Sequence, residues 1–274
     1  MADTGTQYDW QRKDYRAFEL GDVLGRAFSL LRRYFFPFFL AALLIVGVPS
    51  FAAIVTMMLG IGTGASAAVS APSWFGFAIF FVLLIVGSVL LPAAVIYAAL
   101  KGWSGSPISM RQSLGVMFRR FFSLLGLGIL AGLGIALGFA FLIVPGIILY
   151  CGWYVAVAVL VMEKTSVTDA LSRSWELTRG YKWQVFAVVL IAVVISTLIG
   201  IVGSIPAFVL GFQSAELGVT TSEINVTFGV AQVFSSLADI IAQLISALIA
   251  ASTYYELRRV KEGVGVGAIA DIFG

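Results

Sequence analysis

Few residues in this sequence could carry acid–base or metal chemistry. The 274 residues include no histidine and one cysteine, Cys151, which excludes histidine-based catalysis, histidine-ligated metal or haem, iron–sulfur clusters and internal disulfides. An enzyme would need Asp22, Glu163, Asp169 and Glu176 to converge with arginines at one membrane surface. The sequence has no phosphate-binding glycine loop, nucleophile elbow, paired-carboxylate pattern or CxxC. We therefore expect no enzymatic activity and no cofactor.

One further carboxylate, Asp239, lies inside an apolar segment long enough to cross a membrane. Ionisable groups at that depth are costly and often functional. Polar residues recur with it at three- or four-residue spacing, on one helix face: Gln232, Ser235, Ser236, Asp239, Gln243 and Ser246. Gln232, Ser236, Asp239 and Gln243 form a candidate intramembrane polar site. They could line a proton or solute path, make hydrogen bonds between helices, or mark an end of the helix that reaches water.

The composition indicates a membrane protein. Apolar residues make up 60% of the chain and charged residues 11%, whereas soluble domains carry about 25% charged residues. A spanning helix needs about 20 mostly apolar residues, and we predict six. Their ranges are about 35–59, 74–100, 121–162 (two spans, divided at Pro145–Gly146), 183–210 and 226–257.

The positions of the basic residues predict the orientation of these spans. With six spans, all 17 Lys and Arg fall before the first span, after the last, or in the two connections at about 101–120 and 163–182. The other three connections contain none, so the positive-inside rule places both termini in the cytoplasm. A five-span count, with a re-entrant piece in 121–162, would break this pattern. The net charge of +3 therefore indicates a membrane surface and not nucleic acid.

Three segments that precede predicted spans resemble one another. With Glu19, Ser109 and Ser166 aligned, the third following position is acidic or amide, the fifth is leucine and the ninth is aromatic. The seventh is arginine in the first and third segments and valine in the second. The aligned residues are Asp22, Gln112 and Asp169; Leu24, Leu114 and Leu171; Arg26, Val116 and Arg173; and Phe28, Phe118 and Trp175. Gln112 and Asp169 suit the third position of a capping box, and Asp22–Arg26 and Asp169–Arg173 are predicted to pair at i,i+4 spacing.

This pattern predicts one membrane domain, 1–274, built from three repeats. Each repeat is a cytoplasmic amphipathic helix followed by a transmembrane hairpin, in an all-α fold. Their ranges are about 19–100, 109–162 and 166–257, with a polar N-terminal segment at 1–18 and a tail at 258–274.

The three amphipathic helices are expected to lie in the membrane interface, with their basic side chains toward anionic lipid headgroups. The alternative is that they are solvated cytoplasmic loops, or that they attract anionic lipid only generically. The candidate headgroup-binding residues are Arg26, Arg32, Arg33, Arg119, Arg120, Arg173, Arg179 and Lys182.

Pro145–Gly146, Trp153, Glu163 and the run SVTDALSRSWELTRGYKWQVF at 166–186 resemble the membrane domain attached to some glycerophosphoryl diester phosphodiesterases. They are equally similar to stand-alone YciC-like inner-membrane proteins. The resemblance is most specific over about 141–186 and implies a bacterial inner-membrane bundle. The phosphodiesterase activity of the fused relatives belongs to a separate soluble barrel with catalytic histidines. Since this chain contains no histidine, that activity is not expected here.

We therefore expect a non-enzymatic, multi-pass protein of the bacterial inner membrane, with both termini cytoplasmic. It would organise, assemble or regulate membrane components through anionic lipid headgroups or a partner membrane protein. The alternative is a transporter or channel for a lipid or small solute through the helix bundle near Asp239. A polar, water-accessible cavity among the spans would favour this alternative, and a dry bundle would favour the first function.

Overall fold

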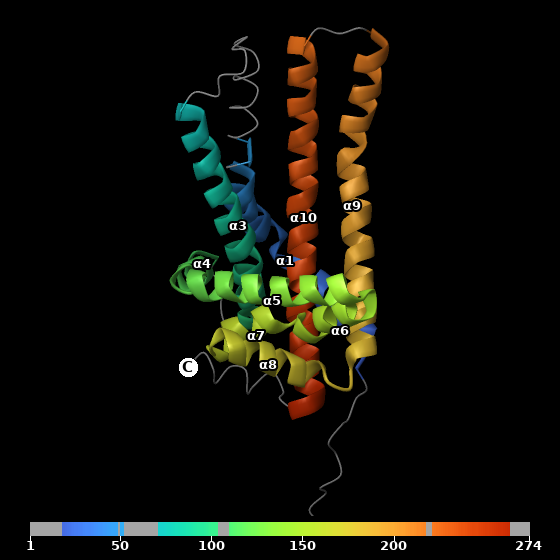
Figure 1. The fold of residues 1–274 in the computed structure, drawn as a ribbon. Coiled ribbons are helices and arrows are strands. Elements are labelled where there is room, and N and C mark those ends of the chain that lie inside the picture. Colours follow the sequence, from blue (N-terminus) through green and yellow to red (C-terminus); the bar gives the residue numbers. More distant parts are fainter. Residues whose placement is uncertain (1–17, 49, 52–70, 104–109, 218–220, 264–274) are drawn as a thin grey trace, which may run out of the picture.

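The structure is a computed structural model that describes residues 18–48, 50–51, 71–103, 110–217 and 221–263 (Figure 1). Regular structure in these ranges is helical throughout. The predicted N-terminal segment, except Phe18, and the tail beyond 263 lie outside them. The elements are α1 (Leu20–Ala42), the π-helix η1 (Leu43–Gly47), α3 (Ala71–Trp103), α4 (Met110–Arg119), α5 (Phe121–Phe141), α6 (Ile143–Trp153), α7 (Ala156–Glu163), α8 (Val167–Thr178), α9 (Lys182–Leu217) and α10 (Thr221–Glu262).

The described residues contain six helical segments long and apolar enough to cross a membrane, as the sequence predicts. These are Leu20–Gly47, Ile85–Trp103, Phe121–Phe141, Ile143–Glu163, Lys182–Val209 and Ala231–Glu262. The chain is therefore an all-helical, multi-pass membrane protein.

The long helices α9 and α10 run side by side through the length of the molecule (Figure 1). Gly203 on α9 lets them approach closely, because a Cβ there would lie 2.3 Å from the Cβ of Ala238. Ser196 and Ser246 add a hydrogen bond of 3.1 Å across the pair. Both helices extend beyond the predicted spans, and α9 continues through Pro206 to Leu217.

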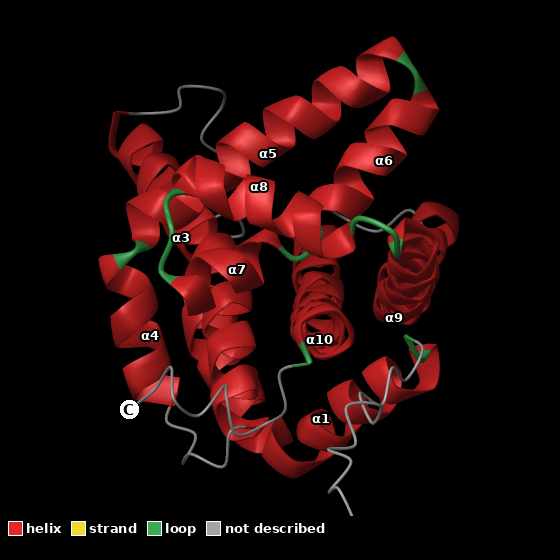
Figure 2. Ribbon diagram, turned by 90° about the horizontal axis from the view of Figure 1, so that it is seen from below, coloured by secondary structure: helices red, strands yellow, loops and turns green. Residues whose placement is uncertain are grey.

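Helix α1 combines an amphipathic part and an apolar part, separated by a bend. Tyr34 leaves helical geometry (φ −121°, ψ 24°) three residues before Pro37. Proline has no N–H for the carbonyl four residues earlier and its ring collides with that carbonyl, so a bend at this position is expected. In Figure 2, α9 and α10 are seen end-on, whereas the first part of α1 lies in the plane of the view beside them.

Helices α4 and α8 also lie crosswise to α9 and α10 (Figures 1 and 2). At the start of α8, the N–H of Asp169 donates to Oγ of Ser166 at 3.3 Å, which confirms the predicted cap. The buried hydroxyl of Ser174 donates to the carbonyl of Gly152 at 2.8 Å and joins α8 to α6. The predicted Asp169–Arg173 pair does not form, since Asp169 bonds to Ser166.

The predicted turn between the third and fourth spans is displaced by a few residues. α5 ends at Phe141, Leu142 is extended (φ −160°, ψ 149°), and α6 begins at Ile143. Pro145 therefore lies in the first turn of α6, where helical N–H groups need no carbonyl partner and proline is tolerated. Gly146 instead lets α5 approach, because a Cβ there would lie 2.5 Å from the ring of Phe139.

The orientation of α5 and α6 differs from a bundle of parallel spans. Both helices cross in front of α10 and α9 (Figure 1), and in Figure 2 they lie in the plane of the view. Their apolar side chains stay largely exposed, and Phe122 and Phe141 exceed 80% exposure. Such a surface suits hydrocarbon, whether the hairpin crosses the membrane or lies along it.

We predict that the tip of the α5–α6 hairpin is inaccessible to water from both sides of the membrane. In a Cys151→Ala background, the Ile143→Cys variant should remain unlabelled by a membrane-impermeant maleimide in intact cells and in inverted vesicles. The reason is that the crosswise hairpin keeps its exposed apolar tip, with Ile143 68% exposed, in hydrocarbon. A Lys164→Cys variant is the control and should be labelled from one side only. Labelling at position 143 from the opposite side would contradict the crosswise arrangement.

Candidate functional site

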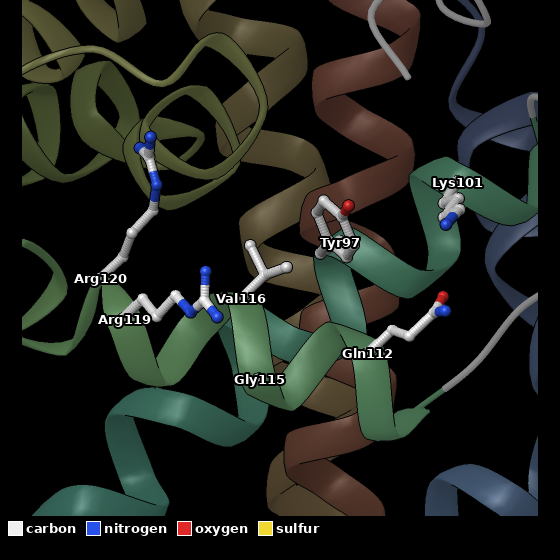
Figure 3. Close-up of a pocket in the computed structure, with 7 residues that line it drawn as sticks. All are labelled: Tyr97, Lys101, Gln112, Gly115, Val116, Arg119 and Arg120. Carbon is white, nitrogen blue, oxygen red and sulfur yellow. The ribbon is translucent and has the colours of Figure 1, made fainter. Parts of the chain in front are cut away.

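A cavity of about 490 Å³ lies between the C-terminal end of α3 and one face of α4 (Figure 3). α3 contributes Tyr97 and Lys101, which are one helical turn apart. α4 contributes residues at positions i, i+3, i+4 and i+7, which share one helix face: Gln112, Gly115, Val116 and Arg119. Arg120, the hinge residue between α4 and α5, completes the lining.

Another face of α4 packs against the rest of the protein. Ser113 and Met117 are buried, whereas Gln112 and Arg119 on the cavity side are exposed. A Cβ added at Gly115 would meet no atom within 4 Å. The glycine thus leaves open space on the cavity side of α4, although glycine in a helix costs about 1 kcal/mol relative to alanine.

The cavity is electropositive. Of the described residues that line it, three are basic and none is acidic. Arg119 makes no hydrogen bond or ion pair with any described residue, and it extends along the cavity side of α4 (Figure 3). Arg120 points away from α4 in the same view, and its guanidinium donates to the carbonyl of Leu160 at 3.1 Å.

This combination of residues suits the binding of an oxyanion. Guanidinium groups match phosphate and carboxylate oxygens with two parallel N–H donors, and basic pockets at the cytoplasmic ends of membrane helices bind lipid headgroups. The described residues contain no group of acidic or cysteine side chains that could hold a metal ion. The cavity is therefore a candidate anion site.

A second set of charged residues, the Glu256 cluster, joins α1 to the end of α10. Its members are Asp22, Arg26, Glu256 and Arg259. Arg26 donates to Glu256 at 2.7 Å and to Asp22 at 3.1 Å, which confirms the predicted Asp22–Arg26 pair. Arg259 donates to the other oxygen of Glu256 at 2.5 Å. The side chain of Glu256 has no exposed surface, so its negative charge is neutralised by Arg26 and Arg259.

A third set, the Arg173 cluster, joins α7 and α8 to α10. Arg173 donates to Glu163 at 3.3 Å and to Glu176 at 3.1 Å, and it also pairs with Glu262. Burial alone would lower the pKa of Arg173, but the hydrogen bond to Glu176 and the nearby carboxylates outweigh it and raise the pKa. The guanidinium is therefore charged at any physiological pH. Tyr254 on α10 donates to Glu163 at 3.0 Å.

The predicted headgroup residues fall into different environments. Arg26 and Arg173 bind carboxylates of the chain itself. Arg119 and Arg120 both line the cavity, but the guanidinium of Arg120 donates to the carbonyl of Leu160. The ammonium of Lys182 lies over the ring of Trp175, 3.4 Å from its centre. The remaining three are exposed: Arg32, Arg33 and Arg179.

The predicted intramembrane site does not assemble into an enclosed cluster. Gln232 and Asp239 are exposed, Gln243 is half-buried, and none of the three side chains has a polar partner among the described residues. Ser236 donates to the carbonyl of Gln232 on its own helix. The neighbouring Ser235 and Ser246 instead bond to α9, so hydrogen bonding between helices accounts for that part of the stripe.

Three residues of these sites are not among the residues predicted from the sequence: Tyr97, Lys101 and Glu256. Tyr97 and Lys101 are one turn apart on α3, but they line the same cavity as Arg119 only because α4 packs on α3. Glu256 is likewise absent from the predicted site residues, because its partner Arg26 lies 230 residues away in the sequence. Its position in the last apolar helix is a signal that could have found it, since buried carboxylates need a partner.

We predict that Glu256→Gln destabilises the protein far more than Glu176→Gln. Removing one member of a buried ion pair costs about 3–5 kcal/mol, because the partner charge stays buried. The Glu176 side chain is 70% exposed, and exposed pairs contribute about 0–1 kcal/mol. Unfolding of the purified variants by dodecyl sulfate in mixed micelles measures both free energies. Equal losses in the two variants would show that the buried pair has no special importance.

Comparison with known families places these sites in a family context. The model of an uncharacterised protein family, UPF0259, matches residues 76–215, just over half of the chain. This range includes every described residue that lines the cavity and also Arg173. Searches of curated proteins and of solved structures find no match. The chain therefore belongs to the uncharacterised protein family UPF0259.

Proposed function

We propose that this protein is a non-enzymatic integral membrane protein that binds the anionic headgroup of a phospholipid in the cavity between α3 and α4. One observation carries the proposal: Lys101, Arg119 and Arg120 line a cavity of about 490 Å³ without an acidic residue among its described lining. Through such contacts the protein would organise or regulate membrane components.

The flanks of the cavity support a lipid as ligand. Phe118 and Phe122, on either side of the two arginines in sequence, are 68% and 83% exposed. Basic groups beside exposed aromatic side chains are typical of the boundary between headgroups and acyl chains. A water-soluble anion would gain nothing from these apolar side chains.

The proposal includes a bacterial inner-membrane location with both termini in the cytoplasm. The crosswise helices and the C-terminal end of α10 lie in the lower half of the molecule in Figure 1, and Arg26, Arg119, Arg173 and Arg258 belong to these helices. The three predicted repeats would each contribute one crosswise helix to this surface. The resemblance to YciC-like proteins, and to the membrane domain of the phosphodiesterases, remains a sequence prediction and favours the same location.

Carboxylates and arginines do converge at this end, as an enzyme would require. Asp22 joins the Glu256 cluster, while Glu163 and Glu176 join the Arg173 cluster. Each of these carboxylates already accepts hydrogen bonds from a guanidinium or a phenol of the chain. None lines the cavity. We therefore interpret the clusters as supports of the fold.

The alternative function, a transporter or channel, draws less support from the geometry. A second cavity, too narrow to hold a water molecule, lies between α1 and α10 and is lined by Ala27, Phe28, Leu31, Ile245 and Leu248. Neither cavity is lined by the polar stripe around Asp239.

We predict that Arg119→Ala reduces retention of phosphatidylglycerol about tenfold or more, because a charge-assisted hydrogen bond contributes about 1.5–3 kcal/mol. Native mass spectrometry of protein released from mixed phosphatidylglycerol–phosphatidylcholine nanodiscs measures the retained lipid. Arg32→Ala is the matched control, since Arg32 is exposed but lies outside the cavity. Equal losses from both variants would indicate generic attraction to anionic lipid and contradict a specific site. Competition by inorganic phosphate at millimolar concentration would instead indicate a soluble anion as ligand.

Topology gives an independent prediction. Reporter fusions after Gly64 and Ser214 should report the outside of the inner membrane, and fusions after Ser106 and Lys164 the cytoplasm. The reason is that all basic residues would then face the cytoplasm. A reversed result at any of the four positions would contradict the orientation.

A further inference from the structure

We infer that Gln112 and Val116 determine the anion selectivity of the cavity, because they replace the ion pair that the first amphipathic segment carries at the aligned positions. The inference rests on the proposed function and names the residues and the lipid class of the same site. The ligand class is an anionic glycerophospholipid with a small, hydroxyl-bearing headgroup.

The first segment shows what an acid and an arginine do at these positions. Asp22 and Arg26 pair at 3.1 Å, and Arg26 continues to the buried Glu256 on α10 at 2.7 Å. In the third segment, the aligned Arg173 also reaches α10, through Glu262. Both arginines are thereby occupied by carboxylates of the protein.

The second segment has neither the acid nor the arginine. Gln112 and Val116 stand at the aligned positions, one turn apart on α4, and both line the cavity. A carboxylate at position 112 would repel an incoming phosphate and pair with Arg119 or with an arginine at 116. With an amide and a small apolar side chain there, the guanidinium of Arg119 keeps no carboxylate partner among the described residues.

The chemistry of the lining defines the headgroup. Lys101 and Arg119 carry the charge that a phosphodiester needs. The Gln112 amide both donates and accepts hydrogen bonds, so it suits a hydroxyl such as that of a glycerol headgroup. The three basic residues of the lining repel a quaternary ammonium group, so a zwitterionic choline headgroup fits less well.

Gly115 supplies the space that such a headgroup occupies. It is one of the α4 residues that line the cavity, with nothing within 4 Å of an added Cβ. Its aligned counterpart in the first segment is Gly25, where an added Cβ also meets nothing. A leucine at either position should thus be accepted by the fold, but only the one at 115 would fill the cavity.

The test restores the ion pair of the first segment in α4. The double variant Gln112→Asp/Val116→Arg should retain at least tenfold less phosphatidylglycerol than the unmodified protein in the nanodisc experiment, while retention of phosphatidylcholine stays the same. Gly115→Leu should give a similar loss without any change in charge, and Gly25→Leu should give none. Melting temperatures of all variants, measured in detergent, identify any that do not fold.

The outcomes separate this inference from the proposed function. If Arg119→Ala loses phosphatidylglycerol but a folded double variant retains it, the selectivity role of Gln112 and Val116 is overturned and the headgroup site stands. If the double variant does not fold, the single variant Gln112→Asp decides, because its carboxylate alone should repel the phosphate: full retention overturns the inference. If Arg119→Ala also retains the lipid, the headgroup site itself is overturned. Equal loss of phosphatidylcholine in the double variant would overturn the named lipid class.

Discussion

The carboxylate of Glu256 has no exposed surface and lies between the guanidinium groups of Arg26 and Arg259. A buried charge of this kind is tolerated only when its partners stay in place, because the free energy of removing it from water is several kcal/mol. Arg26 must therefore hold the amphipathic part of α1 against the end of α10. The Arg173 cluster does the same for α8 through Glu262. Two of the three amphipathic helices, the first part of α1 and α8 but not α4, are thus fixed to α10 by charge.

This attachment also defines a depth scale along α10. Glu256 and Asp239 are 17 residues apart, or about 26 Å along the helix axis. The hydrocarbon layer is about 30 Å thick. If the Glu256 cluster lies at one membrane surface, the exposed Asp239 lies close to the other. α10 has 42 residues, about 63 Å, so its N-terminal part would extend beyond that surface together with α9. This geometry favours the structural interpretation of the polar stripe.

The orientation of α5 and α6 leaves the charge argument unchanged. A hairpin that returns to its starting side keeps both ends on that side, whether it crosses the hydrocarbon layer or lies along it. The basic residues before α5 and after α7 would then face the cytoplasm in either arrangement. The positive-inside pattern therefore supports an even number of crossings, a condition that six and four crossings both satisfy. In the five-span count, by contrast, the two ends lie on opposite sides.

Local features could be predicted from the sequence because their causes are local. The cap at Ser166, the apolar spans and the Asp22–Arg26 pair depend on residues within one or two turns. The turn at Leu142 was misplaced because proline breaks a helix interior but is accepted in a first turn. The Glu256 cluster and the cavity depend on contacts between distant helices, and a single sequence shows no pairing between them.

The differences between the second amphipathic segment and the other two can be explained by the contacts that Arg26 and Arg173 make with α10. On sequence alone, Val116 at an arginine position indicates only a weaker repeat. In the structure, Arg26 and Arg173 hold crosswise helices to α10, whereas α4 packs on α3 and carries no such arginine at that position. Because no ion pair holds α4 to α10, position 112 can carry an uncharged residue without leaving a buried charge unpaired. Arg119 of α4 lines the cavity and has no hydrogen-bond or ion-pair partner among the described residues. The copy of the motif that differs most from the other two is thus the one beside the cavity.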